Sequence, residues 1–237
     1  QDRTSFPTRR SSDLLNRKPS RRLCSISTQH YAFAVNAFVN MVKKCAAEEY
    51  EFTLRETRTY EIIDDVKTLR SELGILYRNP FNRKVIDKIL RESGLTFHPL
   101  FTAKPHIFVS AANPLAKAAS VTLKDLEPYP CLTFEQGEYN SFYFSEEILS
   151  TVYSKKSIKV SDRATIFNLM IGLNGYTVST GIVSADLNGE NIVAVPLEAE
   201  DSIEVGWICH AAMQLTRQAQ DYLEELKRVI AEYGAGR

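Results

Sequence analysis

The most constraining feature of this sequence is a regular alternation between short strand patterns and amphipathic helix patterns, which begins near residue 23. Apolar side chains within residues 31–42 recur at the spacing of one helix face, whereas those within residues 50–54 alternate with polar ones, as in a half-buried strand. Alternating strands and helices favour parallel strands that are joined by right-handed crossovers and covered by helices. The sequence therefore predicts an α/β fold.

The predicted elements fall into two blocks, residues 23–104 and 105–202, and we expect residues 203–237 to return to the first block. The predicted strands are residues 23–27, 50–54, 73–76, 106–110, 131–135, 158–160, 176–180, 192–195 and 203–209. The predicted helices are residues 31–42, 62–69, 85–92, 122–126, 141–152, 162–172 and 215–230. Ligands of open α/β sheets bind beyond the carboxyl ends of the strands, so two facing blocks place a ligand in the cleft between them.

The composition is that of a globular protein of one or two domains. The 237 residues include 29 basic and 29 acidic side chains, and 44% are hydrophobic, which excludes a disordered chain, a collagen-like fibre and a disulfide-stapled miniprotein. The longest apolar run, residues 32–42, contains Asn36 and Asn40 and is shorter than the roughly 18 residues that cross a membrane. We therefore expect no membrane partner.

The four cysteines lie far apart, without a CxxC pair or a nearby pair of histidines. They are Cys24, Cys45, Cys131 and Cys209. This spacing favours reduced core thiols in a cytosolic protein over a metal site or a redox centre.

The charge is unevenly distributed. Residues 1–22 carry seven basic and two acidic side chains, a net charge of +5, so residues 23–237 carry −5. A basic arm on an acidic body is typical of a nucleic-acid tail. Residues 5–14, however, resemble the translation of a common sequencing-library adapter in one reading frame. We therefore interpret residues 1–14 as a non-native segment and expect the natural protein to extend upstream.

Motifs of catalysis are missing from the sequence. It contains no GxSxG, P-loop, GxGxxG or HExxH pattern, and its four histidines stand in no ligand spacing. The pairs Asp64-Asp65 and Glu146-Glu147 are most simply solvated helix faces. We therefore expect no catalytic residues, no metal and no cofactor.

Polar residues follow several predicted strands. Ser27, Thr28 and Gln29 stand between the first strand and the first helix, where hydroxyls and free backbone N–H groups favour an anion. An N-cap without a ligand is an equally good interpretation. Capping is the simpler role for the pair Ser161-Asp162, and residues 136–141 either close over a ligand or form only a turn.

The order of these elements resembles the effector-binding domain of LysR-type transcriptional regulators over about residues 20–232. Residues 69–75 are similar to the family's D-x-G-I strand, with Glu72 in place of Asp, and residues 113–116 to its H-P-L-A turn, with Asn113 in place of His. Residues 121–126 match its (V/I)-T-(L/P)-x-D-L pattern, and residues 172–175 its G-x-G, with one extra residue, Asn174.

This resemblance implies a periplasmic-binding-protein-like fold of type 2, with two α/β subdomains joined by two crossover strands near residues 103–106 and 200–203. Subdomain I would comprise residues 23–104 with 203–237, subdomain II residues 105–202, and residues 15–22 a linker remnant. A winged helix-turn-helix would belong upstream. By position, the resemblance also implies an effector site that comprises Ser27, Thr28, Gln29, Thr57, Arg58, Gln136, Gly137, Asn140 and Ser161.

The resulting hypothesis is a cytoplasmic sensor of a small anionic effector, without enzymatic activity, that acts in a homodimer or homotetramer. It would reach DNA only through the missing N-terminal domain. Arg58 would pair with an effector carboxylate, or it is only an exposed residue at a helix start. The alternatives are a solute-binding protein of a transporter, an enzyme on the same scaffold or, less favoured, a redox sensor.

Overall fold

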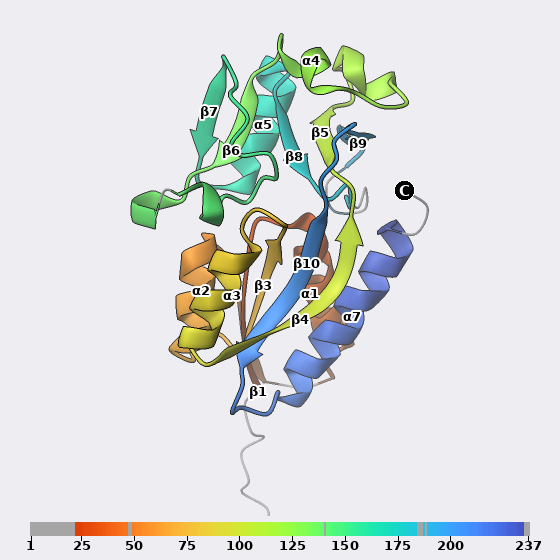
Figure 1. Cartoon of the computed structure of the whole chain (residues 1–237). Coiled ribbons are helices and arrows are strands. Elements are labelled where there is room, and N and C mark those ends of the chain that lie inside the picture. Colours follow the sequence, from red (N-terminus) through yellow and green to blue (C-terminus); the bar gives the residue numbers. More distant parts are fainter. Residues whose placement is uncertain (1–21, 47–48, 140, 184–186, 188, 235–237) are drawn as a thin grey trace, which may run out of the picture.

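A computed structural model describes residues 22–46, 49–139, 141–183, 187 and 189–234, and these residues form two sheets placed end to end (Figure 1). The first sheet has the strand order β2-β1-β3-β10-β4, and the second sheet has the order β7-β6-β8-β5-β9. The predicted fold of two α/β subdomains is confirmed.

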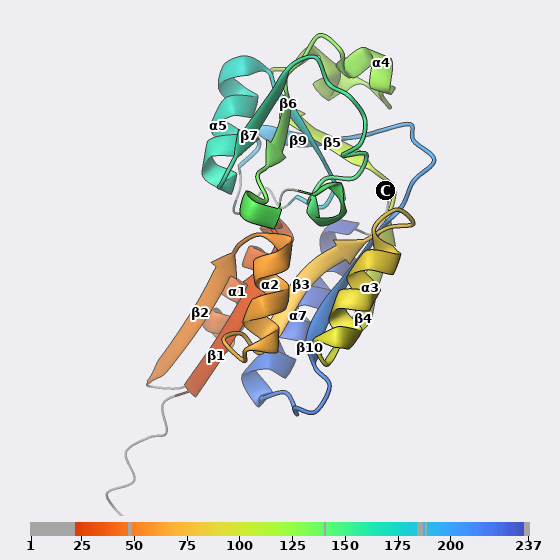
Figure 2. The ribbon, with the colours of Figure 1, turned by 60° about the vertical axis from the view of Figure 1, so that its left-hand side comes forward.

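The first sheet is covered on both faces by helices. Its strands are β1 (Arg22–Thr28), β2 (Tyr50–Glu56), β3 (Leu73–Arg78), β4 (Leu95–Ala103) and β10 (Ile203–His210). Helices α1 (Ala32–Lys44) and α7 (Arg217–Gly234) pack together on one face, and α2 (Thr59–Lys67) and α3 (Arg83–Glu92) cover the other (Figure 2). The Tyr222 hydroxyl of α7 donates to the carbonyl of Ala34 in α1 at 3.2 Å.

The second sheet carries one long helix and several short helical turns. Its strands are β5 (His106–Ser110), β6 (Cys131–Phe134), β7 (Ser157–Val160), β8 (Tyr176–Ser179) and β9 (Ile192–Pro196). Its helices are α4 (Leu123–Leu126) and α5 (Arg163–Leu173), with the 3-10 helices η2 (Pro114–Lys117), η3 (Gly137–Tyr139) and η4 (Phe142–Phe144).

Both sheets are mixed, which corrects the expectation of parallel sheets. β10 runs antiparallel to β3 and β4, and β5 runs antiparallel to β8 and β9. The reason is that the chain crosses between the sheets twice, after β4 and after β9, and each crossing reverses the direction in which the following strand enters its sheet. Both crossings lie where they are expected, because β4 ends at Ala103 and β10 begins at Ile203.

Strand β4 is absent from the sequence prediction. Pro99 interrupts its pattern, since a proline inside a run argues against a strand. The structure accommodates Pro99 opposite Gly206, where the register between β4 and β10 shifts.

The helix predicted at residues 141–152 does not form. Only η4 is helical within this range, and Leu149 adopts a left-handed conformation with φ of 63°. The apolar spacing misled the prediction because the residues pack in two directions. Ile148 is buried in the core, whereas Phe142 and Val152 are exposed.

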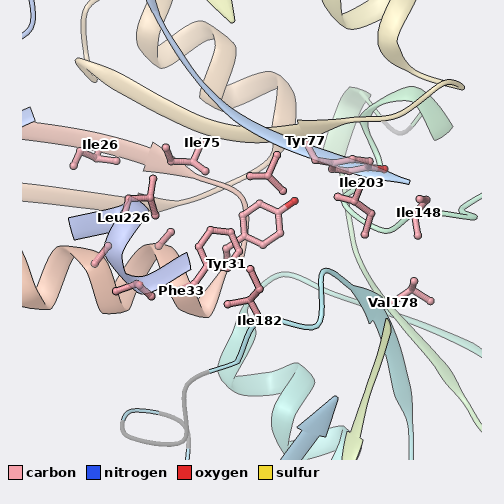
Figure 3. Packing of buried hydrophobic residues seen from close by; sticks show 14 of the residues in the cluster. Ile26, Tyr31, Phe33, Ile75, Tyr77, Ile148, Val178, Ile182, Ile203 and Leu226 are labelled. Carbon is pink, nitrogen blue, oxygen red and sulfur yellow. The ribbon is translucent and has the colours of Figure 1, made fainter. Parts of the chain in front are cut away.

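One hydrophobic cluster runs through both sheets. It contains Ile26 and Ile75 of the first sheet, Val178 of the second, and Tyr31 and Ile182 near the junction (Figure 3). Two smaller clusters lie under α2 with α3 and under α5. The apolar faces of α1 and α7 are therefore packed in the core of this same chain.

Candidate functional site

The candidate site lies where strands of both sheets end. β1 ends at Thr28 and β2 at Glu56, on the side of the first sheet that faces the second, and β6 ends at Phe134. The short helical turns after β6 lie between the two sheets, above α2 (Figure 2). This is the position at which α/β sheets bind ligands.

Gln29 organises the first-sheet wall of the site. Its amide nitrogen donates to the Thr59 hydroxyl at 2.6 Å, and its amide oxygen accepts from the Tyr77 backbone N–H at 3.0 Å and the Tyr31 hydroxyl at 3.1 Å. The side chain is fully buried. Gln29 thereby fixes the turn between β1 and α1.

Gln136 joins the two walls. Its amide oxygen accepts from the backbone N–H of Thr59 at 3.1 Å, and its amide nitrogen donates to Glu146 at 3.2 Å. The Thr59 hydroxyl also donates to the carbonyl of Phe144 at 2.8 Å. The N-terminus of α2 is therefore hydrogen-bonded to the segment that follows β6.

His30 and Glu146 form a buried pair at the centre of the site. The Glu146 carboxylate accepts from the His30 backbone N–H at 2.9 Å and lies 2.9 Å from Nδ1 of the same residue. The two side chains are only 5% and 4% exposed. The imidazole also stacks on Phe134, with ring centroids 4.0 Å apart.

The electrostatics of this pair favour a charged imidazole. Burial lowers the pKa of His30, but the hydrogen bond to Glu146 and the charges of Glu146, Glu56 and Glu147 outweigh burial, so the pKa is raised above its ordinary value. The remaining void beside the pair measures about 30 Å³, which is room for about one water molecule. The chain itself thus fills the centre of the site.

Ion pairs form the rim. Arg163 of α5 contacts Glu56 at the end of β2 at 2.9 Å. Arg58 pairs with Glu135 and, at 3.1 Å, with Glu61. Gly137 lies against Arg58, since a Cβ atom at Gly137 would be 2.7 Å from Nη1.

Four of the predicted site residues, Gln29, Arg58, Gln136 and Gly137, come together between the sheets, and the hydroxyls of three others bond within the first half. The Ser27 hydroxyl donates to Asp65 at 2.6 Å inside the first half, and the Thr28 hydroxyl donates to the carbonyl of Gln29 at 2.8 Å. Thr57 donates to Glu61, and Ser161 is exposed. Asn140 lies outside the described residues.

One of the two expected helix caps differs in the structure. Tyr31, rather than a residue of 27–29, is the N-cap of α1 and makes no side-chain capping bond. Within the predicted cap Ser161-Asp162, Asp162 caps α5, since its carboxylate accepts from the Thr165 N–H at 2.8 Å.

Sequence reasoning missed the three titratable residues at the centre of the site. In the sequence His30 is one of four scattered histidines, and the pair Glu146-Glu147 is most simply interpreted as a solvated helix face. The only local signal was the position of His30 directly after Gln29, at the same strand end. Nothing in the sequence indicated that Glu146, 116 residues away, is its partner.

Glu147 is buried between the site and a cavity. Its carboxyl accepts from the Phe134 N–H at 2.8 Å and from the Ser145 hydroxyl at 3.2 Å. Burial and the neighbouring Glu146 raise the pKa of Glu147 to about 8. The cavity has a volume of about 590 Å³ and lies among β6, β8, α4 and residues 141–155.

The cysteines do not form a reactive centre. All four are free, and burial is the main cause that raises the pKa of Cys24 (to about 12), Cys131 and Cys209, so these three remain thiols. His98 lies 3.7 Å from Cys209, but burial lowers the pKa of this histidine. Among the described residues, no three His, Cys, Asp or Glu side chains gather as metal ligands would.

The fold and the site together define a two-lobed α/β domain with a cluster of buried polar contacts between its sheets. The sequence matches the LysR substrate binding domain family over residues 46–231. The chain belongs to this family of regulatory domains. No curated protein sequence matches it. Within the described part of the chain, none of the helices has the length and apolarity of a membrane span.

Solved structures share the fold at low sequence identity. HinK, a LysR family transcriptional regulator from Pseudomonas aeruginosa, is 16% identical with a TM-score of 0.58, over 92% of this chain and 72% of HinK. The effector-binding domain of QuiR, solved with shikimate, is 16% identical with a TM-score of 0.58 (88% of this chain, 97% of that one). The BenM effector-binding domain, solved with benzoate, is 16% identical with a TM-score of 0.58, over 91% of this chain and 95% of that one.

Proposed function

We propose that this domain senses a small anionic effector that binds between subdomain I (residues 23–104 with 203–237) and subdomain II (residues 105–202). One observation carries the proposal. The backbone N–H and imidazole of His30 and the amide of Gln136 come from different sheets and converge on one carboxylate position. Such convergent donors are the usual means of holding an anion. QuiR with shikimate and BenM with benzoate support a carboxylate ligand.

The predicted site residues divide into two roles in this proposal. Gln29, Arg58, Gln136 and Gly137 form the walls of the effector site, together with His30. Ser27, Thr28 and Thr57 support the first-sheet wall through their own hydrogen bonds. Ser161 stands at the edge, before the helix that carries Arg163.

The effector would act by shifting a conformational equilibrium. A ligand that contacts both subdomains favours the geometry in which its contacts are best, and its effect is limited to its differential affinity, typically about 1–3 kcal/mol. We propose that a homodimer or homotetramer transmits this change to a DNA-binding domain outside residues 23–237. Because a regulator of transcription works where the DNA is, we place it in the cytoplasm, in a non-enzymatic role.

A thermal-shift screen of small carboxylates and inorganic anions tests the proposal. We expect at least one anion to raise the Tm of the wild-type chain, and Gln136→Ala to lose that shift because one of the convergent donors is gone. Gln214→Ala, an exposed amide outside the site, is the matched control and should keep the shift. A shift that survives in Gln136→Ala contradicts the proposed site.

A further inference from the structure

Glu146 is held in the way that a bound carboxylate ligand is held. The backbone N–H and Nδ1 of His30 and the amide of Gln136 surround its two oxygens at 2.9–3.2 Å. The side chain is 4% exposed, and it reaches across from the second half to the N-terminal end of α1. The sequence predicts an anion in this region, and the structure supplies one from the chain itself.

We infer that Glu146 is a built-in competitor of the effector: its carboxylate occupies the anion position, and a small monocarboxylate binds there only after Glu146 has left. This inference rests on the proposed function, since it takes the position between the sheets as the effector site. It adds the class of ligand and the way in which the site is regulated.

Space makes the two carboxylates mutually exclusive. With Glu146 in place, the void beside His30 measures about 30 Å³, so about one water molecule fits and an organic acid does not. The void is bounded by the aromatic rings of Phe134 and Phe167 and by Arg163. Only the departure of the Glu146 side chain frees enough volume and donors for a ligand.

Charge determines what can replace Glu146. The ionisable groups around His30 are Glu56, Glu146, Glu147, Asp162 and Arg163, and Arg163 is engaged by Glu56. When Glu146 leaves, the protonated His30 loses its hydrogen-bonded partner in a buried site, which is costly. A neutral ligand leaves this charge unpaired, whereas a monocarboxylate restores the pair and accepts the same three donors.

The segment that carries Glu146 has room to move. Residues 141–155 form one side of the cavity of about 590 Å³, so the space behind the segment is not filled by core side chains. Leu149 lies within it at φ of 63°, a conformation that costs a non-glycine residue free energy. Tyr143 and Tyr153 are exposed. The segment can therefore withdraw Glu146 without opening either sheet.

Chemical rescue tests the inference on the full chain. Glu146→Ala removes the internal carboxylate, and we expect its Tm to fall and sodium acetate to restore most of the loss. Acetamide, which has the same shape without the charge, and sodium chloride at equal ionic strength should restore little. Glu135→Ala removes another carboxylate that pairs across the two halves, which is 41% exposed, and acetate should not rescue it. Equal effects of acetate, acetamide and chloride on Glu146→Ala overturn the inference.

A binding comparison separates this inference from the proposed function. If Glu146 occupies the site most of the time, its removal should tighten the affinity for acetate or benzoate by about tenfold or more, because the competent fraction rises. Equal affinity in the wild type and in Glu146→Ala overturns the competition. Binding to Glu146→Ala alone supports it, while showing that no carboxylate effector acts on the wild type, which contradicts the proposed function.

A second variant keeps the test decisive if Glu146→Ala does not fold. Glu146→Gln preserves the shape of the side chain and removes its charge. We expect the pKa of His30, measured by NMR titration of its ring protons, to be lower in Glu146→Gln than in the wild type. An unchanged pKa means that the two groups are not paired, and this result overturns the inference.

Discussion

Glu147 is the residue whose protonation should most strongly affect folding. Burial beside Glu146 raises its pKa to about 8, whereas a glutamate in an unfolded chain titrates near about 4.3. Between these two pH values the folded protein holds a proton that the unfolded chain has released. The free energy of unfolding therefore falls as the pH rises, by at most about 1.4 kcal/mol per pH unit for this one group.

The variant Glu147→Gln tests this linkage because glutamine fills the same space without titrating. We expect its stability relative to the wild type to increase from about pH 5 to about pH 8 in urea unfolding. The pKa of His30 is also raised, so this residue also lowers the free energy of unfolding as the pH rises, and it does so in both proteins. Glu138→Gln, at an exposed position, should show no such trend. A difference between Glu147→Gln and the wild type that does not change with pH contradicts the buried, protonated carboxyl.

Individual residues show how far the sequence predicts the candidate site. Gln29 and Gln136 could be predicted because each follows a strand, and strand ends face the ligand position in this class of fold. Ser27 stands at a strand end too, but side chains alternate along a strand, and its hydroxyl points to Asp65 instead. Glu146 could not be predicted, since its burial depends on an irregular segment that has no periodic pattern.

Two glycines in different elements should respond oppositely to the same substitution. A Cβ atom at Gly206 in β10 would lie 2.2 Å from Cζ of Phe97 and 2.6 Å from the carbonyl oxygen of His98. The backbone oxygen cannot move without disturbing the β4–β10 pairing, so Gly206→Ala should lower the free energy of unfolding by about 1–3 kcal/mol.

Gly172 in α5 has no atom within 4 Å of the corresponding Cβ position, so Gly172→Ala should raise the stability by up to about 1 kcal/mol. Urea unfolding of both variants measures the contrast. A Gly206→Ala variant as stable as the wild type contradicts the close packing of β10 against β4. A destabilised Gly172→Ala variant contradicts the open space beside Gly172.

Regular elements could be predicted, and irregular ones could not. The strand at residues 106–110 has the predicted bounds, and the helix predicted at residues 85–92 ends where expected and begins two residues earlier, at Arg83. Each of these elements has one apolar period throughout. Strand β4 could not be predicted because it contains Pro99. The proline is tolerated where the register between β4 and β10 shifts, and this pairing cannot be inferred from the local sequence. Helices commonly end at a residue in the left-handed conformation, usually glycine and sometimes asparagine. The extra residue Asn174 ends α5 in this way, at φ of 53°.

At the scale of the whole molecule, the order of the elements predicts two blocks, with residues 203–237 returning to the first, and the family resemblance adds the two crossover strands. Alternating strands and helices alone predicted parallel sheets, because local patterns do not reveal a chain that crosses twice between two sheets. The continuous cluster explains why the crossings are stable. Ile203, at the start of β10, packs in the same core as Tyr31 and Ile182, so each crossing is anchored by burial on both sides.

The uneven charge of the chain leads to a prediction about DNA. Residues 1–22 carry a net charge of +5 and residues 23–237 carry −5. Binding to duplex DNA depends on the neutralisation of phosphates, and the logarithm of its equilibrium constant falls by about 0.9 per contacted phosphate for each unit of log salt. Any affinity of this chain for DNA should therefore come from residues 1–22.

Replacing the seven basic residues of positions 1–22 by glutamine should weaken binding to a labelled duplex by about tenfold or more at about 50 mM salt, and flatten its salt dependence. Replacing Lys67 and Lys84, two exposed lysines of the first half, should leave the affinity unchanged, because they stand on a body of net negative charge. Fluorescence anisotropy over a series of salt concentrations measures both. If the affinity and the salt slope survive the loss of the N-terminal charges, the domain itself carries a DNA-binding surface, and the assignment of DNA contact to a separate domain fails.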